Sequence, residues 1–98
     1  MKTIEKQLNN ENARELYKAL SVLVDPKEIS DFLRDLLTIE EIGEAVRRFQ
    51  VAKMLESGKS FRQIQTKTNM SSTTVARINY WLHHGTGGYR RALEKLKS

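Results

Sequence analysis

Apolar residues recur three or four positions apart along almost the whole chain, and few residues interrupt the pattern. This spacing places them on one face of an α-helix, because a helix turns once in about 3.6 residues. The 98 residues include only one proline and five glycines, so residues that end helices are scarce. No segment alternates apolar and polar residues as a half-buried strand would. The sequence therefore predicts an all-α fold.

Two helices are predicted before residue 37. Six apolar residues form the stripe of a first helix over about residues 5–23: Ile4, Leu8, Leu16, Tyr17, Leu20 and Leu23. Asp25 then stands at the N-cap position of a second helix and Pro26 at its first position, where proline is tolerated. We expect this second helix to run to about Leu36.

A long third helix follows. Thr38-Ile39-Glu40-Glu41 has the pattern of a capping box, in which Thr38 accepts a hydrogen bond from the amide of Glu41 and Glu41 reaches back. Gly58 can end the helix, since glycine adopts a left-handed conformation easily. One face is predicted to carry Ile42, Ala45, Val46, Phe49, Ala52 and Leu55.

Three shorter helices are predicted in the last 40 residues. Ser60-Phe61-Arg62-Gln63 is a second capping box and opens a helix to about Lys67. Another helix begins near Ser71, and Gly85-Thr86-Gly87-Gly88 separates it from a last one. The inner face of the helix that begins near Ser71 is expected to carry Val75, Ile78, Trp81 and Leu82.

The segment from about residue 60 to 84 fits a helix-turn-helix. Two helices that cross steeply are held by apolar residues that face each other, and the segment supplies Ile64, Met70, Val75 and Ile78. Asn69 can take the positive backbone angle that the turn requires, because asparagine tolerates it better than most residues. Ser71 is then placed to cap the second helix.

The start of that second helix is where a recognition helix would enter the major groove of DNA. Its small hydroxyl side chains can approach bases and phosphates closely, and cations on either side can bind phosphate or guanine. The predicted DNA-binding residues are Arg62, Lys67, Ser71, Ser72, Thr73, Thr74 and Arg77. An ordinary helical hairpin, in which the hydroxyl cluster only caps a helix, is the alternative.

Charge is distributed unevenly along the chain. Residues 1–46 carry a net charge of −4 and residues 47–98 a net charge of +9, which together give +5. A basic half joined to an acidic half indicates a surface for a polyanion on one side. A solvated basic face without a partner would give the same charges.

Other function classes lack the residues they need. No cysteine is present, so disulfides, thiolate metal sites and cysteine nucleophiles are excluded. His83 and His84 are adjacent and face different directions, which makes them poor joint metal ligands. The apolar runs are too short to cross a bilayer, and the N-terminus lacks a signal-peptide pattern. We expect a cytoplasmic protein that enters no membrane, needs no cofactor or metal, and is not an enzyme.

From Leu36 to Leu82 the chain resembles the tryptophan repressor (TrpR) superfamily, and more closely its TrpR-like YerC/YecD branch. The shared residues are Leu37-Thr38, Arg48, Gly58, Ser60-Phe61-Arg62-Gln63-Ile64 and Thr74-Val75-Ala76-Arg77. The resemblance implies a six-helix fold with a helix-turn-helix. It also implies a homodimer in which the N-terminal helices of two chains intertwine about a two-fold axis.

The resemblance further implies a ligand pocket. In the repressor two arginines hold the corepressor tryptophan, and Arg48 and Arg77 match them, while Thr38 matches a third pocket residue. The family has a glycine and a serine where this chain has Ile78 and Trp81. Two large apolar side chains would fill the space that the indole ring needs. We therefore expect that L-tryptophan does not bind.

Taken together, the sequence predicts one TrpR-like domain over residues 1–98. Its predicted function is that of a homodimeric transcriptional regulator, most simply a repressor, that binds double-stranded DNA without tryptophan as corepressor. A dimeric protein-interaction module of the same fold, with no specific DNA target, is the alternative function.

Overall fold

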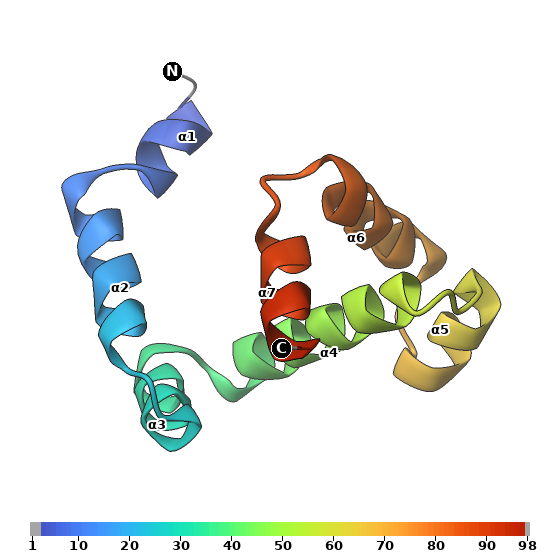
Figure 1. Cartoon of the computed structure of the whole chain (residues 1–98), viewed down its shortest axis with the longest axis horizontal. Helices are drawn as coiled ribbons and strands as arrows, with labels where there is room; N and C mark the ends of the chain where they lie inside the picture. Colours follow the sequence, from blue (N-terminus) through green and yellow to red (C-terminus); the bar gives the residue numbers. More distant parts are fainter. Residues whose placement is uncertain (1–2, 98) are drawn as a thin grey trace. The chain divides into compact units, whose positions relative to one another are not determined.

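The computed structural model describes the backbone of residues 3–97 and the side chains of residues 6–97. Within this part the chain is helical and contains no strand, which confirms the predicted all-α class (Figure 1). The helices are α1 (Thr3–Leu8), α2 (Glu11–Val22), α3 (Pro26–Leu36), α4 (Ile39–Glu56), α5 (Phe61–Thr68), α6 (Ser72–His84) and α7 (Gly88–Lys97).

The chain divides into two compact units, Met1–Ile39 and Glu40–Ser98. The first contains α1 to α3, and the second contains α4, apart from its first residue, and α5 to α7. Two helical units of one chain can belong to a single domain. One domain over residues 1–98 therefore stays a prediction.

The first predicted helix, over about residues 5–23, is in fact two helices, so the described chain has seven helices where six were expected. Asn10 separates them with an extended backbone (φ −126°, ψ 176°). Its Oδ1 accepts a hydrogen bond from the Ala13 amide at 2.8 Å, and its Nδ2 donates to the carbonyls of Lys6 and Gln7, each at 3.0 Å. One side chain thus satisfies the end of α1 and the start of α2. Hydrogen bonds from an asparagine side chain to the backbone compete in this way with the backbone hydrogen bonds of a continuous helix.

Apolar residues of the N-terminal unit are only partly covered. The N-cap of α3 is Asp25, with Pro26 at the first position as predicted, but no residue of α2 or α3 is fully buried. Val22 and Val24 are 65% and 87% exposed. The side chain of Ile4, part of the predicted stripe, lies outside the described residues. Half-buried positions along and just after the two helices are Ala13, Leu16, Ala19, Leu20, Leu23, Ile29, Phe32, Leu33 and Leu37.

The C-terminal unit contains a buried apolar core to which all four of its helices contribute. Its residues are Val51 and Ala52 of α4, Ile64 of α5, Val75, Ile78 and Leu82 of α6, and Leu93 of α7. The helix-turn-helix residues Ile64, Val75 and Ile78 are fully buried, and Met70 packs against the core, as predicted.

Three predicted inner-face residues are exposed, among them Ala45 of α4. Trp81 is 44% exposed, because Val75, Ile78 and Leu82 already occupy the buried stripe of α6 and leave Trp81 at its edge. On α4, Val46 is 61% exposed whereas Val51, which was not predicted, is fully buried. Ala52 is buried and Phe49 and Leu55 pack against the core, as predicted, so the prediction for this face fails at Ala45 and Val46.

Capping signals position the connections of the C-terminal unit. Helix α4 begins directly after Thr38, and Gly58 follows its end with φ 86°. The Lys59 amide donates to the Met54 carbonyl at 3.0 Å, which closes the last turn of α4. This turn directs the chain into α5.

Candidate nucleic-acid interface

The turn between α5 and α6 depends on Asn69. Its backbone is left-handed, with φ 59° and ψ 22°, as the sequence predicts. The Asn69 amide donates to the Gln65 carbonyl at 2.8 Å and so ends α5. Among the described non-glycine residues it is the one with a positive φ.

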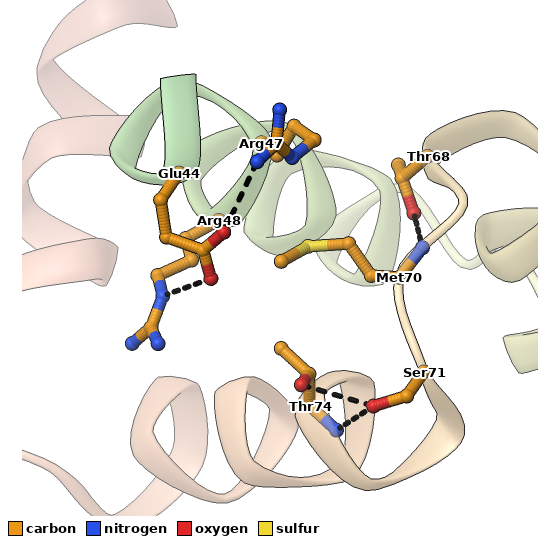
Figure 2. Close-up of polar contacts among 7 residues, drawn as sticks. All are labelled: Glu44, Arg47, Arg48, Thr68, Met70, Ser71 and Thr74. Carbon is orange, nitrogen blue, oxygen red and sulfur yellow. Dashed lines mark hydrogen bonds and ion pairs between the residues drawn. The ribbon is translucent and has the colours of Figure 1, made fainter. Parts of the chain in front are cut away.

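Thr68 holds the turn from inside and was not identified from the sequence. It is buried, and its Oγ1 donates to the Ile64 carbonyl at 2.7 Å. The Met70 amide in turn donates to the same Oγ1 at 3.3 Å (Figure 2). The sequence feature that could have identified Thr68 is its position in the last turn of an amphipathic helix. A threonine hydroxyl there reaches the carbonyl of the residue four positions earlier.

Ser71 caps α6. Its Oγ accepts from the Thr74 amide at 3.1 Å and donates to the Thr74 hydroxyl at 3.0 Å (Figure 2). Two of the four predicted hydroxyl residues are therefore engaged in the cap. Ser72 and Thr73 are exposed, and their side chains make no hydrogen bond within the described part of the chain. They are the hydroxyls free to meet a partner.

Three predicted cations lie on the two helices that meet at this turn. Arg62 and Lys67 are exposed on α5, and Arg77 is exposed on α6. None of them takes part in an ion pair with another described residue. Helix α5 itself is fixed by the predicted capping box: Ser60 Oγ accepts from the Gln63 amide at 3.1 Å, and the Ser60 amide donates to Gln63 Oε1 at 2.8 Å.

Arg48, expected as a pocket residue, is already engaged by a carboxylate. Its Nε donates to Glu44 Oε1 at 3.2 Å, while Arg47 Nη2 donates to Glu44 Oε2 at 3.2 Å (Figure 2). These hydrogen bonds, first from Arg48 and then from Arg47, hold the pKa of Glu44 below its ordinary value, because they stabilise the charged form. Sequence reasoning did not identify Glu44.

The other expected pocket residues lie in different surroundings. Ile78 is fully buried in the core, and Arg77 beside it points to solvent. Trp81 lines an open, mostly apolar hollow. Thr38 belongs to the N-terminal unit. The remaining residues of the hollow are Phe49, Gly85, Thr86, Gly88, Tyr89 and Ala92.

Neither a cluster of metal-ligand side chains nor a membrane-spanning helix is found among the described residues. No group of three or more His, Cys, Asp or Glu side chains is placed there to hold a metal ion. No described helix has the length and the apolar character needed to cross a membrane.

Known proteins share both the sequence and the fold of this chain. The family described as Trp repressor protein matches residues 11–97. The uncharacterized protein YerC of Bacillus subtilis (strain 168) is 33% identical over 91 residues, which cover 93% of this chain and 88% of YerC.

Two solved structures have the same arrangement of helices. A TrpR-like protein from Eubacterium eligens is 37% identical, covers 94% of this chain and 95% of its own, and superposes with a TM-score of 0.88. A crystal structure from Staphylococcus aureus is 30% identical, with coverage of 99% and 96% and a TM-score of 0.88. The chain belongs to the Trp repressor family, in its YerC-like branch.

Proposed function

We propose that this protein is a sequence-specific DNA-binding transcriptional regulator that acts as a homodimer and represses the genes it binds. The observation that carries the proposal is the start of α6, where Ser72 and Thr73 are exposed and unbonded within the described chain. Arg62 and Lys67 of α5 and Arg77 of α6 are exposed and form no ion pair with another described residue. Side chains of these types bind base edges and phosphates.

The size of α6 supports this proposal. An α-helix with its side chains is about 10–12 Å across, and the major groove of B-DNA is ~12 Å wide. Small residues at the N-terminus of the helix let it enter deeply, and the positive end of the helix dipole favours nearby phosphates. The Ser71 cap leaves Ser72 and Thr73 as the first side chains to meet the base pairs.

The apolar surface of the N-terminal unit supports a dimer. Neither α2 nor α3 contains a fully buried residue, and most helical stability in proteins comes from burying an apolar face. A second chain would cover this surface. In a two-fold dimer, paired recognition helices contact half-sites about 34 Å apart, a geometry for which the Trp repressor itself is a standard example.

Binding without tryptophan is supported by the surroundings of the matched arginines. Glu44 already supplies a carboxylate to Arg48, and Ile78 is a large side chain packed in the core. To bind there, free tryptophan would have to displace the Glu44 carboxylate from Arg48 and find room beside the Ile78 side chain. DNA binding is therefore proposed to require no tryptophan.

Selection from genomic DNA tests this function. Purified protein is incubated with sheared genomic DNA from its own organism, without added tryptophan, and the retained fragments are sequenced. The proposal predicts enriched fragments that share a pair of inverted half-sites about one helical turn apart. Recovery of fragments in proportion to total DNA would contradict it and favour a protein-interaction module.

A further inference from the structure

A groove at the C-terminal end of α4 lies against α5, and of its lining residues only Lys67 belongs to the predicted DNA-binding set. It is lined by Gln50, Lys53, Met54, Lys59, Gln63 and Lys67. Three of these residues are lysines and none is acidic. The volume of the groove is about 450 Å³, whereas one water molecule takes up roughly 30 Å³ in the liquid. The groove therefore has room for a hydrated phosphate group.

A second hollow continues this groove along α5, because Gln63 and Lys67 line both. Arg62 and Thr66 complete the second lining, which again lacks an acidic residue. We call the four cations of the two hollows the basic track: Lys53, Lys59, Arg62 and Lys67. Lys53 and Lys59 were not predicted as DNA-binding residues, since they lie outside the helix-turn-helix.

The four cations of the basic track form no ion pair with another described residue. Among the described residues, Lys27 pairs with Asp31, Glu44 with both Arg47 and Arg48, and Lys97 with Glu56. Glu56 lies on the same helix as Lys53, three residues later, yet its ion-pair partner comes from α7. The four cations of the track are therefore left to attract an external anion. Four neighbouring cations can attract several adjacent negative charges at once. A polyanion therefore fits the track better than a single ion does.

We propose that the basic track binds the DNA backbone just outside the half-site contacted by α6, an inference that rests on the proposed function. The first helix of a helix-turn-helix crosses the phosphate backbone, which places Arg62 and Lys67 beside it. Lys53 and Lys59 extend the row of cations from α5 to the end of α4, and no residue of α6 lines either hollow. The track thus positions the protein along the duplex without reading its bases.

The test compares two double variants on two lengths of DNA. Lys53→Gln with Lys59→Gln removes two charges from the track. Lys18→Gln with Lys95→Gln removes two charges from exposed lysines of α2 and α7 and serves as the control. The long duplex extends about one helical turn beyond each half-site of the best genomic fragment, and the short duplex ends at the half-sites.

On the long duplex, the track variant is expected to bind more weakly by roughly tenfold or more at 0.1 M salt, with a salt slope about four units shallower, because the dimer loses two charges from each chain. On the short duplex, the track variant and the unmodified protein are expected to bind alike. The control variant is expected to match the unmodified protein on both. Thermal unfolding of all three proteins checks that the substitutions leave the fold intact.

Two results would overturn the inference while leaving the proposed function standing. The first is unchanged affinity of the track variant for the long duplex. The second is an equal loss on both duplexes, which would place the lysines at phosphates inside the half-site. Failure of the unmodified protein to prefer the selected duplex over a scrambled one would instead refute the proposed function.

Discussion

At the scale of single residues, two exposed side chains near the start of α6 are expected to contribute differently to DNA binding. Arg62→Ala should weaken binding to all sequences by a similar factor, because a phosphate contact carries no sequence information. It should reduce the salt slope by about two units, one for each chain of the dimer. Thr73→Ala should mainly reduce the preference for the selected sequence, since this side chain is proposed to meet the base edges. Fluorescence anisotropy with the selected and a scrambled duplex measures both effects.

Matched substitutions away from α6 control for charge and for the hydroxyl group. Arg34→Ala removes an exposed arginine of α3, and Thr86→Ala removes an exposed threonine of the loop before α7. Both variants should bind as the unmodified protein does. Unchanged binding by Arg62→Ala and Thr73→Ala together would remove the assignment of α6 as the recognition helix.

Glu44 provides a residue-scale prediction about pH. Its folded pKa lies below the ordinary value of 4.5, with Arg48 the larger cause and Arg47 the smaller. The ion pairs therefore stabilise the fold fully above the unfolded pKa, and this contribution is lost as pH falls through the folded pKa. Because Glu44 is solvent-exposed, the effect on stability is expected to be small.

Carbon-detected NMR titration of the Glu44 carboxyl measures this pKa directly. Arg48→Met should raise it toward 4.5, and Arg47→Met should raise it by a smaller amount. An equal or greater effect of Arg47→Met would show that the carboxylate is held differently from the geometry described above.

At the scale of the helical elements, the turn between α5 and α6 should tolerate glycine but not alanine at position 69. The left-handed backbone costs an L-residue with a Cβ about 1–2 kcal/mol, and asparagine and glycine adopt it more easily. Asn69→Ala should therefore lower the melting temperature by several degrees, whereas Asn69→Gly should change it little. Asn79→Ala, within α6, is a control for the loss of an amide. Equal melting temperatures for Asn69→Ala and Asn69→Gly would contradict this role.

Most helix boundaries were predictable because local chemistry sets them. Asp25, Ser60, Asn69 and Ser71 each act within one turn of the chain, and the structure places each where the pattern predicts. The break at Asn10 was missed because the apolar stripe on either side continues across it. One side chain there competes with the helix, and periodicity does not report such competition.

The predicted faces of helices were less accurate than their ends. Trp81 and Val46 are large apolar residues of the kind that usually form a core, but they are exposed. Which stripe of a helix is buried depends on neighbouring helices that are distant in sequence. The buried hydroxyl of Thr68 and the Glu44 carboxylate depend likewise on contacts that the pattern of apolar residues does not encode. Of the candidate site, the exposed hydroxyls and cations of α5 and α6 and the caps at Ser60 and Ser71 were therefore predictable, whereas the hydrogen bonds of Thr68 and the ion pairs of Glu44 were not identified.

At the scale of the whole molecule, the protein is expected to be a dimer at micromolar concentration. The N-terminal unit exposes apolar side chains and buries none of those on α2 and α3 completely, which a monomer of this size would rarely maintain. Light scattering should give twice the chain mass of 11.3 kDa. Leu20→Glu, at a half-buried position of α2, should shift the protein toward monomer, whereas Lys18→Glu nearby should not. A mass of 11.3 kDa for the unmodified protein throughout this range would contradict the dimer.

The central claim is that the protein recognises a DNA sequence without tryptophan, and binding to the selected duplex as a function of salt tests it most directly. Fluorescence anisotropy is recorded from about 50 to 200 mM salt, a range over which six to ten phosphate contacts would lower affinity roughly 10³–10⁵-fold. The account predicts a steep decrease of log affinity with log salt, and a preference for the selected over the scrambled duplex. It also predicts that both are unchanged by millimolar L-tryptophan. Equal affinity for the two duplexes, or specific binding that appears only when tryptophan is added, would contradict the account.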